Sequence, residues 1–278
     1  MFASTQFPLK SISGRIASTL SFAFILIGVS SQLPSYSQER TKQTPVASQA
    51  EADKTYSLRR VYKKGEVTRH KTQMTMMMHN PQGGDEINIV MNFVTKELVN
   101  SAEEDGSNSV TTEYEKAAVS VLGTEQDLLS SLPKITVSHD KDGKATTKVE
   151  GGSPQTSQMF AGMGDMVKMG ETVFPKKPVK VGESWEVETK VPGQNGADAS
   201  TFKSSMKLVS IETLDEVKVF RLESKTDSDG ATPVHQTATI LIEVETGKLV
   251  KMYLKGEVEA AGQPMKMEMN MNMVKPLK

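Results

Sequence analysis

The sequence predicts a mainly β protein, built either as two antiparallel meanders or as one strongly curved antiparallel sheet, with a single helix near residues 153–169. Three observations support this prediction. From residue 55 onward, short β-patterned runs alternate with turn signals such as Asp142-Gly143. Several runs place apolar residues at every second position, as a strand buried on one face does. Only residues 153–169 show apolar residues at helical spacing.

The composition is that of a globular protein. Of the 278 residues, 37% are hydrophobic and 24% are charged, which allows one or two hydrophobic cores. The formal net charge of -1 shows no excess of positive charge with which to bind nucleic acid or an anionic membrane, so neither is expected as a partner. Aromatic residues make up only 5%, whereas the chain has 17 methionines. The core is therefore expected to depend on Met, Val, Leu and Ile.

Residues 1–37 have the features of a signal peptide. A positively charged start precedes the apolar run from Ile16 to Val29, which is too short to span a bilayer comfortably, and the small residues Ser35 and Ser37 precede a suitable cleavage point. An uncleaved anchor is the alternative. Because the chain has no Cys, it has no site for bacterial lipoprotein processing. We expect an exported protein, periplasmic or extracellular, with no stable transmembrane span after processing.

The remaining chain divides into four predicted segments. Residues 38–54 are polar and aperiodic, which predicts a disordered leader. A first β meander is expected over residues 55–150, the helix and a Pro-rich connector over 151–183, and a second meander over 184–278.

The second meander is expected to begin with a strand buried on one face. Trp185 and Val187 alternate with charged residues there, so we predict that Trp185 is buried. Just before this strand, Val181-Gly182-Glu183 resembles Lys64-Gly65-Glu66, which precedes the first meander. The similarity favours two related halves.

The connector carries the pattern P-x-x-P-V-x-V-G-E-S-W between Phe174 and Trp185. This pattern resembles the signature of a family of exported bacterial proteins of unknown function, and the opening at Tyr56 is similar to that family's first strand. The resemblance implies a β architecture over residues 55–275 and export, with no catalytic residue to carry over. A curved sheet with a helix against it also resembles the periplasmic lipoprotein carriers, although a fold analogy does not define function.

The sequence contains no recognisable catalytic arrangement. It has no Cys, no G-x-S-x-G, no H-E-x-x-H and no phosphate-binding glycine loop. None of its four histidines has a second His at metal-ligand spacing. These observations favour a non-catalytic protein without a cofactor.

Methionines are the most distinctive feature of the chain. One run covers residues 74–78, and a second alternates strictly over residues 265–273, so that its methionines share one face of a strand. Three interpretations stay open: packing in a filled core, a flexible groove for a hydrophobic small molecule or lipid, and a Cu(I) site. The candidate groove residues are Met159, Met163, Met166, Met267, Met269 and Met271. The candidate copper ligands are His70, Met74 and Met76.

The leading hypothesis is non-catalytic binding of an apolar or lipid-like ligand in the cell envelope. A structural or interaction module with a filled core is the first alternative, and a Met/His copper-binding protein is the second.

Overall fold

The structure is a computed structural model. It describes residues 54–79, 86–142, 144–153, 174–191, 200–229, 233–260 and 263–274. The predicted signal peptide, the predicted leader up to residue 53 and the predicted helix from residue 154 onward lie outside these ranges. Within them, the one helical element is the 3-10 turn η1 (Leu129–Ser131), and no helix is long and apolar enough to cross a membrane.

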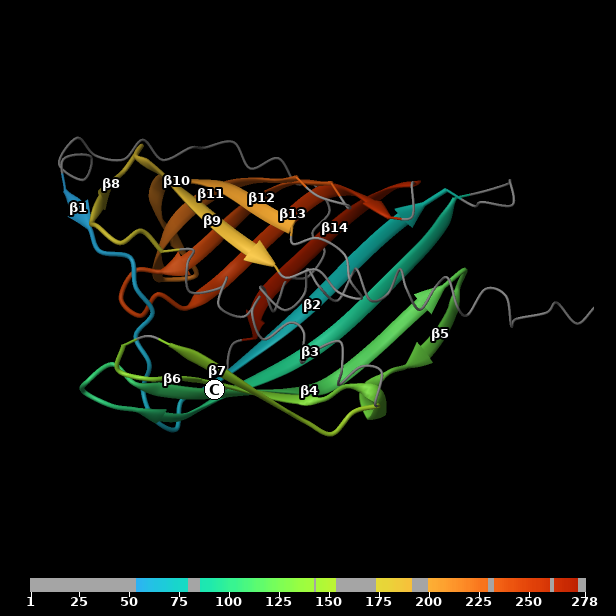
Figure 1. The fold of residues 1–278 in the computed structure, drawn as a ribbon, viewed down its shortest axis with the longest axis horizontal. Helices are drawn as coiled ribbons and strands as arrows, with labels where there is room; N and C mark the ends of the chain where they lie inside the picture. Colours follow the sequence, from blue (N-terminus) through green and yellow to red (C-terminus); the bar gives the residue numbers. More distant parts are fainter. Residues whose placement is uncertain are drawn as a thin grey trace, which may run out of the picture.

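Twelve antiparallel strands form one open sheet, which confirms the predicted mainly β class (Figure 1). Their order is β7-β6-β4-β3-β2-β14-β13-β12-β11-β10-β9, with β5 paired to β4, so β7 and β9 end the sheet. The strands of the first half are β2 (Val67–Met78), β3 (Ile87–Ala102), β4 (Asn108–Val121), β5 (Thr124–Asp127), β6 (Lys134–His139) and β7 (Ala145–Glu150). Those of the second half are β9 (Ser184–Val191), β10 (Ser200–Leu214), β11 (Val217–Asp229), β12 (Val234–Glu243), β13 (Leu249–Ala260) and β14 (Gln263–Val274).

The pairing of β2 with β14 joins the two halves. The sequence left open two meanders or one curved sheet, and the structure combines them as two meanders within a single sheet. The pairing is continuous from Met265 opposite Met78 to Val274 opposite Arg69. In Figure 1 the sheet bends, so that β9 to β13 lie above β3 to β7, with β2 and β14 crossing between them. Register shifts interrupt the β3–β4, β10–β11 and β12–β13 pairs. Such bulges bend strands and increase their twist.

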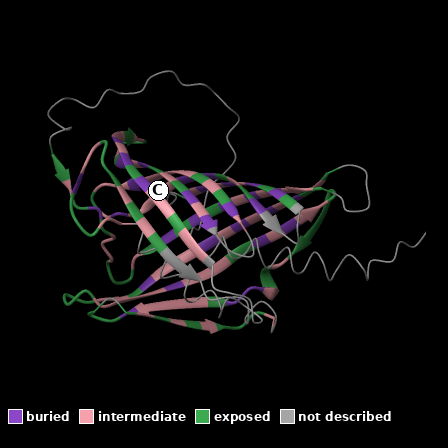
Figure 2. Ribbon diagram, turned by 45° about the horizontal axis from the view of Figure 1, so that its top comes forward, coloured by how far each residue is buried: buried purple, intermediate pink, exposed green. Residues whose placement is uncertain are grey.

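The hydrophobic core lies on one face of the sheet, which we call the inner face. Buried and more exposed residues alternate along most strands, as Figure 2 shows. One core cluster contains residues from both halves, among them Met91 and Val119 of the first and Val234 and Leu254 of the second. Residues from both halves therefore share one core.

Trp185 corrects one prediction. It is half-buried rather than buried, and it packs against a second cluster that includes Leu208 and Phe220. Its strand, β9, pairs with β10 on one side and ends the sheet on the other. The alternating pattern identified the face on which Trp185 lies, but it could not reveal that the strand is at an edge.

The two similar turns before the meanders have the same structure. Gly65 and Gly182 both adopt positive φ, at 78° and 93°, a conformation that glycine adopts without steric cost. The Gly65 N–H donates to the Val99 carbonyl at 2.8 Å, and the Gly182 N–H donates to the Leu208 carbonyl at 2.7 Å. In both halves the accepting residue immediately precedes a register shift. This shared geometry supports the predicted relationship between the halves.

A strap before β2 contacts both halves of the sheet. It begins with β1 (Thr55–Tyr56), which pairs with β8 (Val179–Lys180), and the Tyr56 ring lies edge-on to Phe220 with centroids 5.4 Å apart. Farther along, the Val61 N–H donates to the Thr246 carbonyl at 2.7 Å. The strap therefore passes over the second half before it enters the first.

A charged group fixes the end of this strap. The Arg60 guanidinium lies 3.5 Å from the Glu66 carboxylate and 4.9 Å from the centre of the Tyr62 ring. Lys248, in the turn between β12 and β13, also pairs with Glu66. These charges are largely shielded from water, where ion pairs are screened less than at the surface.

We predict that Gly247→Ala destabilises the protein far more than Gly65→Ala. Both glycines have positive φ, which costs a residue with a side chain about 1 kcal/mol. A Cβ at Gly65 has nothing within 4 Å, whereas a Cβ at Gly247 would collide with the Arg59 carbonyl of the strap. We expect a loss of about 1 kcal/mol for Gly65→Ala and about 3 kcal/mol for Gly247→Ala. Urea denaturation followed by circular dichroism measures both, and equal losses would contradict the strap contact.

Candidate functional site

Methionines from four neighbouring strands meet on the inner face of the sheet. The β2–β14 register pairs Met74 with Met269, Met76 with Met267 and Met78 with Met265. On the flanking strands, Met91 of β3 lies opposite Met74, and Met252 of β13 lies opposite Met271. We call this set the methionine rows: Met74, Met76, Met78, Met91, Met252, Met265, Met267, Met269 and Met271.

The methionine rows belong to the core. Met74, Met91, Met269 and Met271 have no exposed surface, and Met78 packs against the same cluster from a partly buried position. The prediction that the C-terminal stripe faces inward is therefore confirmed. The candidate groove residues on β14 all lie in the rows, whereas Met159, Met163 and Met166 lie outside the described residues. The role of the predicted helix as a partner of the stripe stays a prediction.

The rows form a continuous thioether surface. Directly opposite residues of an antiparallel pair have Cβ atoms about 4.5–5.5 Å apart, so the side chains of adjacent strands touch. Methionine is unbranched and polarisable and has three rotatable bonds, so it can repack around an irregular partner more readily than Ile or Leu. The sequence suggested two separate methionine runs. Their union depends on pairing residues almost 200 positions apart, which no local pattern predicts.

One polar group lies beside the methionine rows. Gln236 of β12 is opposite Gly256 of β13, which is opposite Met267. The missing side chain at Gly256 brings the strands close together: a Cβ there would lie 2.7 Å from both the Gln236 Cβ and the His235 carbonyl. The Gln236 Oε1 atom is buried and accepts no hydrogen bond from the described residues. It gives this part of the apolar face an acceptor without a partner, which sequence reasoning did not identify.

His70 lies at the other end of the rows, between Thr95 of β3 and Met273 of β14. Its side chain is only 3% exposed, and burial lowers the pKa of His70 well below its ordinary value of 6.5. The imidazole is therefore neutral at physiological pH. Neither ring nitrogen has a hydrogen-bond partner in the part of the chain that the structure describes. Buried polar groups are rarely left without partners.

The predicted copper set is not brought together. Met74 and Met76 follow His70 on the same strand by four and six residues, which corresponds to about 13 and 20 Å at strand rise. The methionine opposite His70 is Met273, and it was not among the candidate ligands. Among the described residues, no group of three or more His, Asp or Glu side chains could hold a metal ion.

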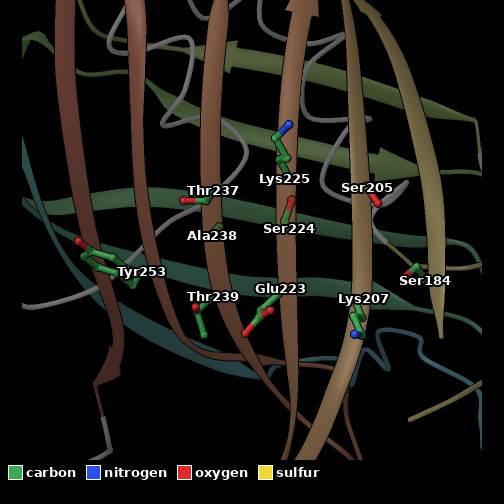
Figure 3. Close-up of a pocket in the computed structure, with 10 residues that line it drawn as sticks. All are labelled: Ser184, Ser205, Lys207, Glu223, Ser224, Lys225, Thr237, Ala238, Thr239 and Tyr253. Atoms are coloured by element: carbon green, nitrogen blue, oxygen red, sulfur yellow. The ribbon is translucent and has the colours of Figure 1, made fainter. Parts of the chain in front are cut away.

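The opposite, outer face of the second half carries a shallow, open groove of about 400 Å³. Lys207, Glu223, Thr239 and Tyr253 form one cross-strand row through it (Figure 3). Both charged side chains are exposed, and Tyr253 is 39% exposed. Binding pockets are usually concave and mostly apolar, with a few placed polar groups. This groove is open to solvent and is lined mainly by hydroxyl-bearing and charged residues, so it is a weaker candidate than the inner face.

No protein-family model matches the chain, and no curated protein matches it in sequence. The resemblance of the connector to a family of exported proteins is therefore not confirmed.

Several solved structures show some similarity to the fold. The hypothetical lipoprotein YmcC from Escherichia coli K12 is 13% identical, with 79% of this chain and 92% of that chain covered and a TM-score of 0.29. A chain named as an exported protein with a YmcC-like fold, from Bacteroides fragilis, is 8% identical (79% and 100% covered, TM-score 0.27). A domain named for outer membrane lipoprotein sorting, from Vibrio parahaemolyticus, is 9% identical (76% and 87% covered, TM-score 0.17). These identities and TM-scores are too low to assign the chain to the family of any of these proteins.

We predict that position 269 tolerates only an apolar side chain. Met269→Leu keeps volume and apolarity and should cost less than about 1.5 kcal/mol. Met269→Glu places a carboxylate in the core, and we expect a loss of about 3 kcal/mol or more. The matched control is Asn270→Glu, one residue along on the outer face, which should change stability by less than about 1 kcal/mol. Thermal melts compare the variants, and similar losses at positions 269 and 270 would show that the stripe is not core.

Proposed function

We propose that this chain is an exported, non-catalytic binding protein of the cell envelope and that its methionine rows hold an apolar, lipid-like molecule. The observation that carries the proposal is the continuous thioether surface over four adjacent strands, with the buried acceptor of Gln236 beside it. Ligand sites typically combine such an apolar lining with a few polar groups that orient the ligand. A lipid-like molecule with one hydrogen-bond donor matches both features.

The methionines would accommodate the ligand by repacking. Most of the row side chains are fully buried among one another, so an incoming molecule must replace contacts between thioethers. Exchange of one apolar contact for another costs little when the side chains are flexible. Among the described strands, the sheet ends at β7 and β9 without closing, so separation of the two sides of the bend would break no strand pairing.

We predict that a larger side chain in the rows weakens binding of a hydrophobic probe. Met267→Phe adds volume and removes flexibility at the centre of the rows, while Lys266→Phe places the same ring on the exposed outer face. The probe is 1-N-phenylnaphthylamine, whose fluorescence rises in an apolar environment. We expect saturable binding by the wild-type protein, an affinity about tenfold lower for Met267→Phe, and an unchanged affinity for Lys266→Phe. Circular dichroism confirms that both variants are folded.

Native mass spectrometry of the protein purified from its own host tests the proposal independently. A retained lipid-like adduct that Met267→Phe reduces would support it. If the wild-type protein binds no probe and retains no adduct, the methionine rows are a filled core and the protein is a structural or interaction module.

A further inference from the structure

His70 is a buried histidine whose ring nitrogens lack partners in the described residues. Its Nδ1 atom lies 3.8 Å from Oε1 of Glu97, which is beyond hydrogen-bond distance. The hydroxyl of Thr95, on the strand next to His70, is also buried without a partner in this part of the chain. Leaving a buried donor or acceptor without a hydrogen bond costs free energy. A bound ligand at the imidazole would remove that cost.

The side chains beside His70 are soft ligands. Met273 lies directly opposite His70 on β14, and Met271 lies one inward-facing position farther along, opposite Thr72. Directly opposite Cβ atoms are about 4.5–5.5 Å apart, and diagonal neighbours lie about 7–8 Å apart, which long side chains can bridge. Two thioethers and one imidazole can therefore converge. Met271 is fully buried, whereas Met273 is half-buried, so part of its side chain is exposed to solvent.

We propose that His70, Met271 and Met273 form a binding site for Cu(I). The Nδ1 atom is the ring nitrogen that lies on the side of Glu97, 3.8 Å from its carboxylate, which leaves Nε2 as the metal ligand. Thioether sulfur is a soft ligand that suits Cu(I), and imidazole binds copper in its neutral form. Harder divalent ions prefer more oxygen ligands than this position offers. The site lies at one end of the methionine rows and does not depend on the proposed apolar ligand.

The strand pairing determines which methionines lie beside His70, and the copper hypothesis from sequence lacked this information.

Competition for Cu(I) tests the site. The full chain is titrated under reducing, oxygen-free conditions against the Cu(I) complex of bathocuproine disulfonate. We expect one Cu(I) per wild-type chain and affinities lower by about tenfold or more for His70→Gln, Met271→Leu and Met273→Leu. Met265→Leu, at the far end of the same strand, is the matched control and should bind as the wild type does. Leucine keeps side-chain volume and apolarity, so the three methionine variants should remain folded.

Nuclear magnetic resonance with Ag(I), a redox-inert substitute for Cu(I), gives a second measurement. A shift of the His70 Nε2 resonance on addition of Ag(I) would support the site. The proposal is overturned if the wild-type chain fails to compete for Cu(I), if Met273→Leu competes as well as the wild type, if Met265→Leu weakens binding equally, or if the His70 resonance does not move.

Discussion

The antiparallel pairing of β2 with β14 is the constraint on which the rest of the structure depends. It joins the first long strand of the chain to the last and makes one sheet of two meanders. A shift of one residue in the alignment of β14 would turn its methionines to the outer face and bring Lys266, Glu268 and Asn270 into the core. The cost of burying those polar groups specifies the register strongly. Core, candidate ligand surface and candidate metal site all follow from that register.

The two halves begin alike but end differently. Each opens with a glycine turn that bonds to the neighbouring strand just before a register shift. The strand after the first turn, β2, has partners on both sides, whereas β9, after the second turn, pairs only with β10 among the described strands. This difference explains why Met74 and Met76 of β2 are fully buried while Trp185 of β9 is only half-buried. An edge strand lacks the neighbour whose side chains would complete its burial.

The sequence predicted local properties well, because strand alternation and turn conformation depend on residues that are close together in the chain. The inward face of residues 265–273 and the related turns at Gly65 and Gly182 were both predicted. Strand order was not, since the energy that pairs residue 74 with residue 269 comes from contacts that no local window contains. The same limit explains the candidate copper ligands. Strand alternation places Met74 and Met76 on the same face as His70, whereas Met273 is its neighbour across the strand pair.

The two proposals assign different chemistry to the two parts of one surface. The central methionines offer flexible apolar contact, and the end beside His70 adds a neutral nitrogen to the same kind of sulfur. Both assignments need the methionines of residues 74–78 and 265–273 on adjacent strands and on one face. A different register would separate His70 from Met273 and break the methionine rows into two unrelated runs.

Disulfide cross-linking tests the register most directly, because the chain contains no Cys of its own. Lys71 and Asn272 are paired across β2 and β14, so their Cα atoms should lie about 4.5–5.5 Å apart, within the range of a disulfide. In the double variant Lys71→Cys/Asn272→Cys, mild oxidation should form an intramolecular disulfide. The control Lys71→Cys/Asn270→Cys is offset by two residues, about 7–8 Å away, and should cross-link poorly. Efficient cross-linking of the offset pair would contradict the β2–β14 register, and so would a failure of both pairs to cross-link.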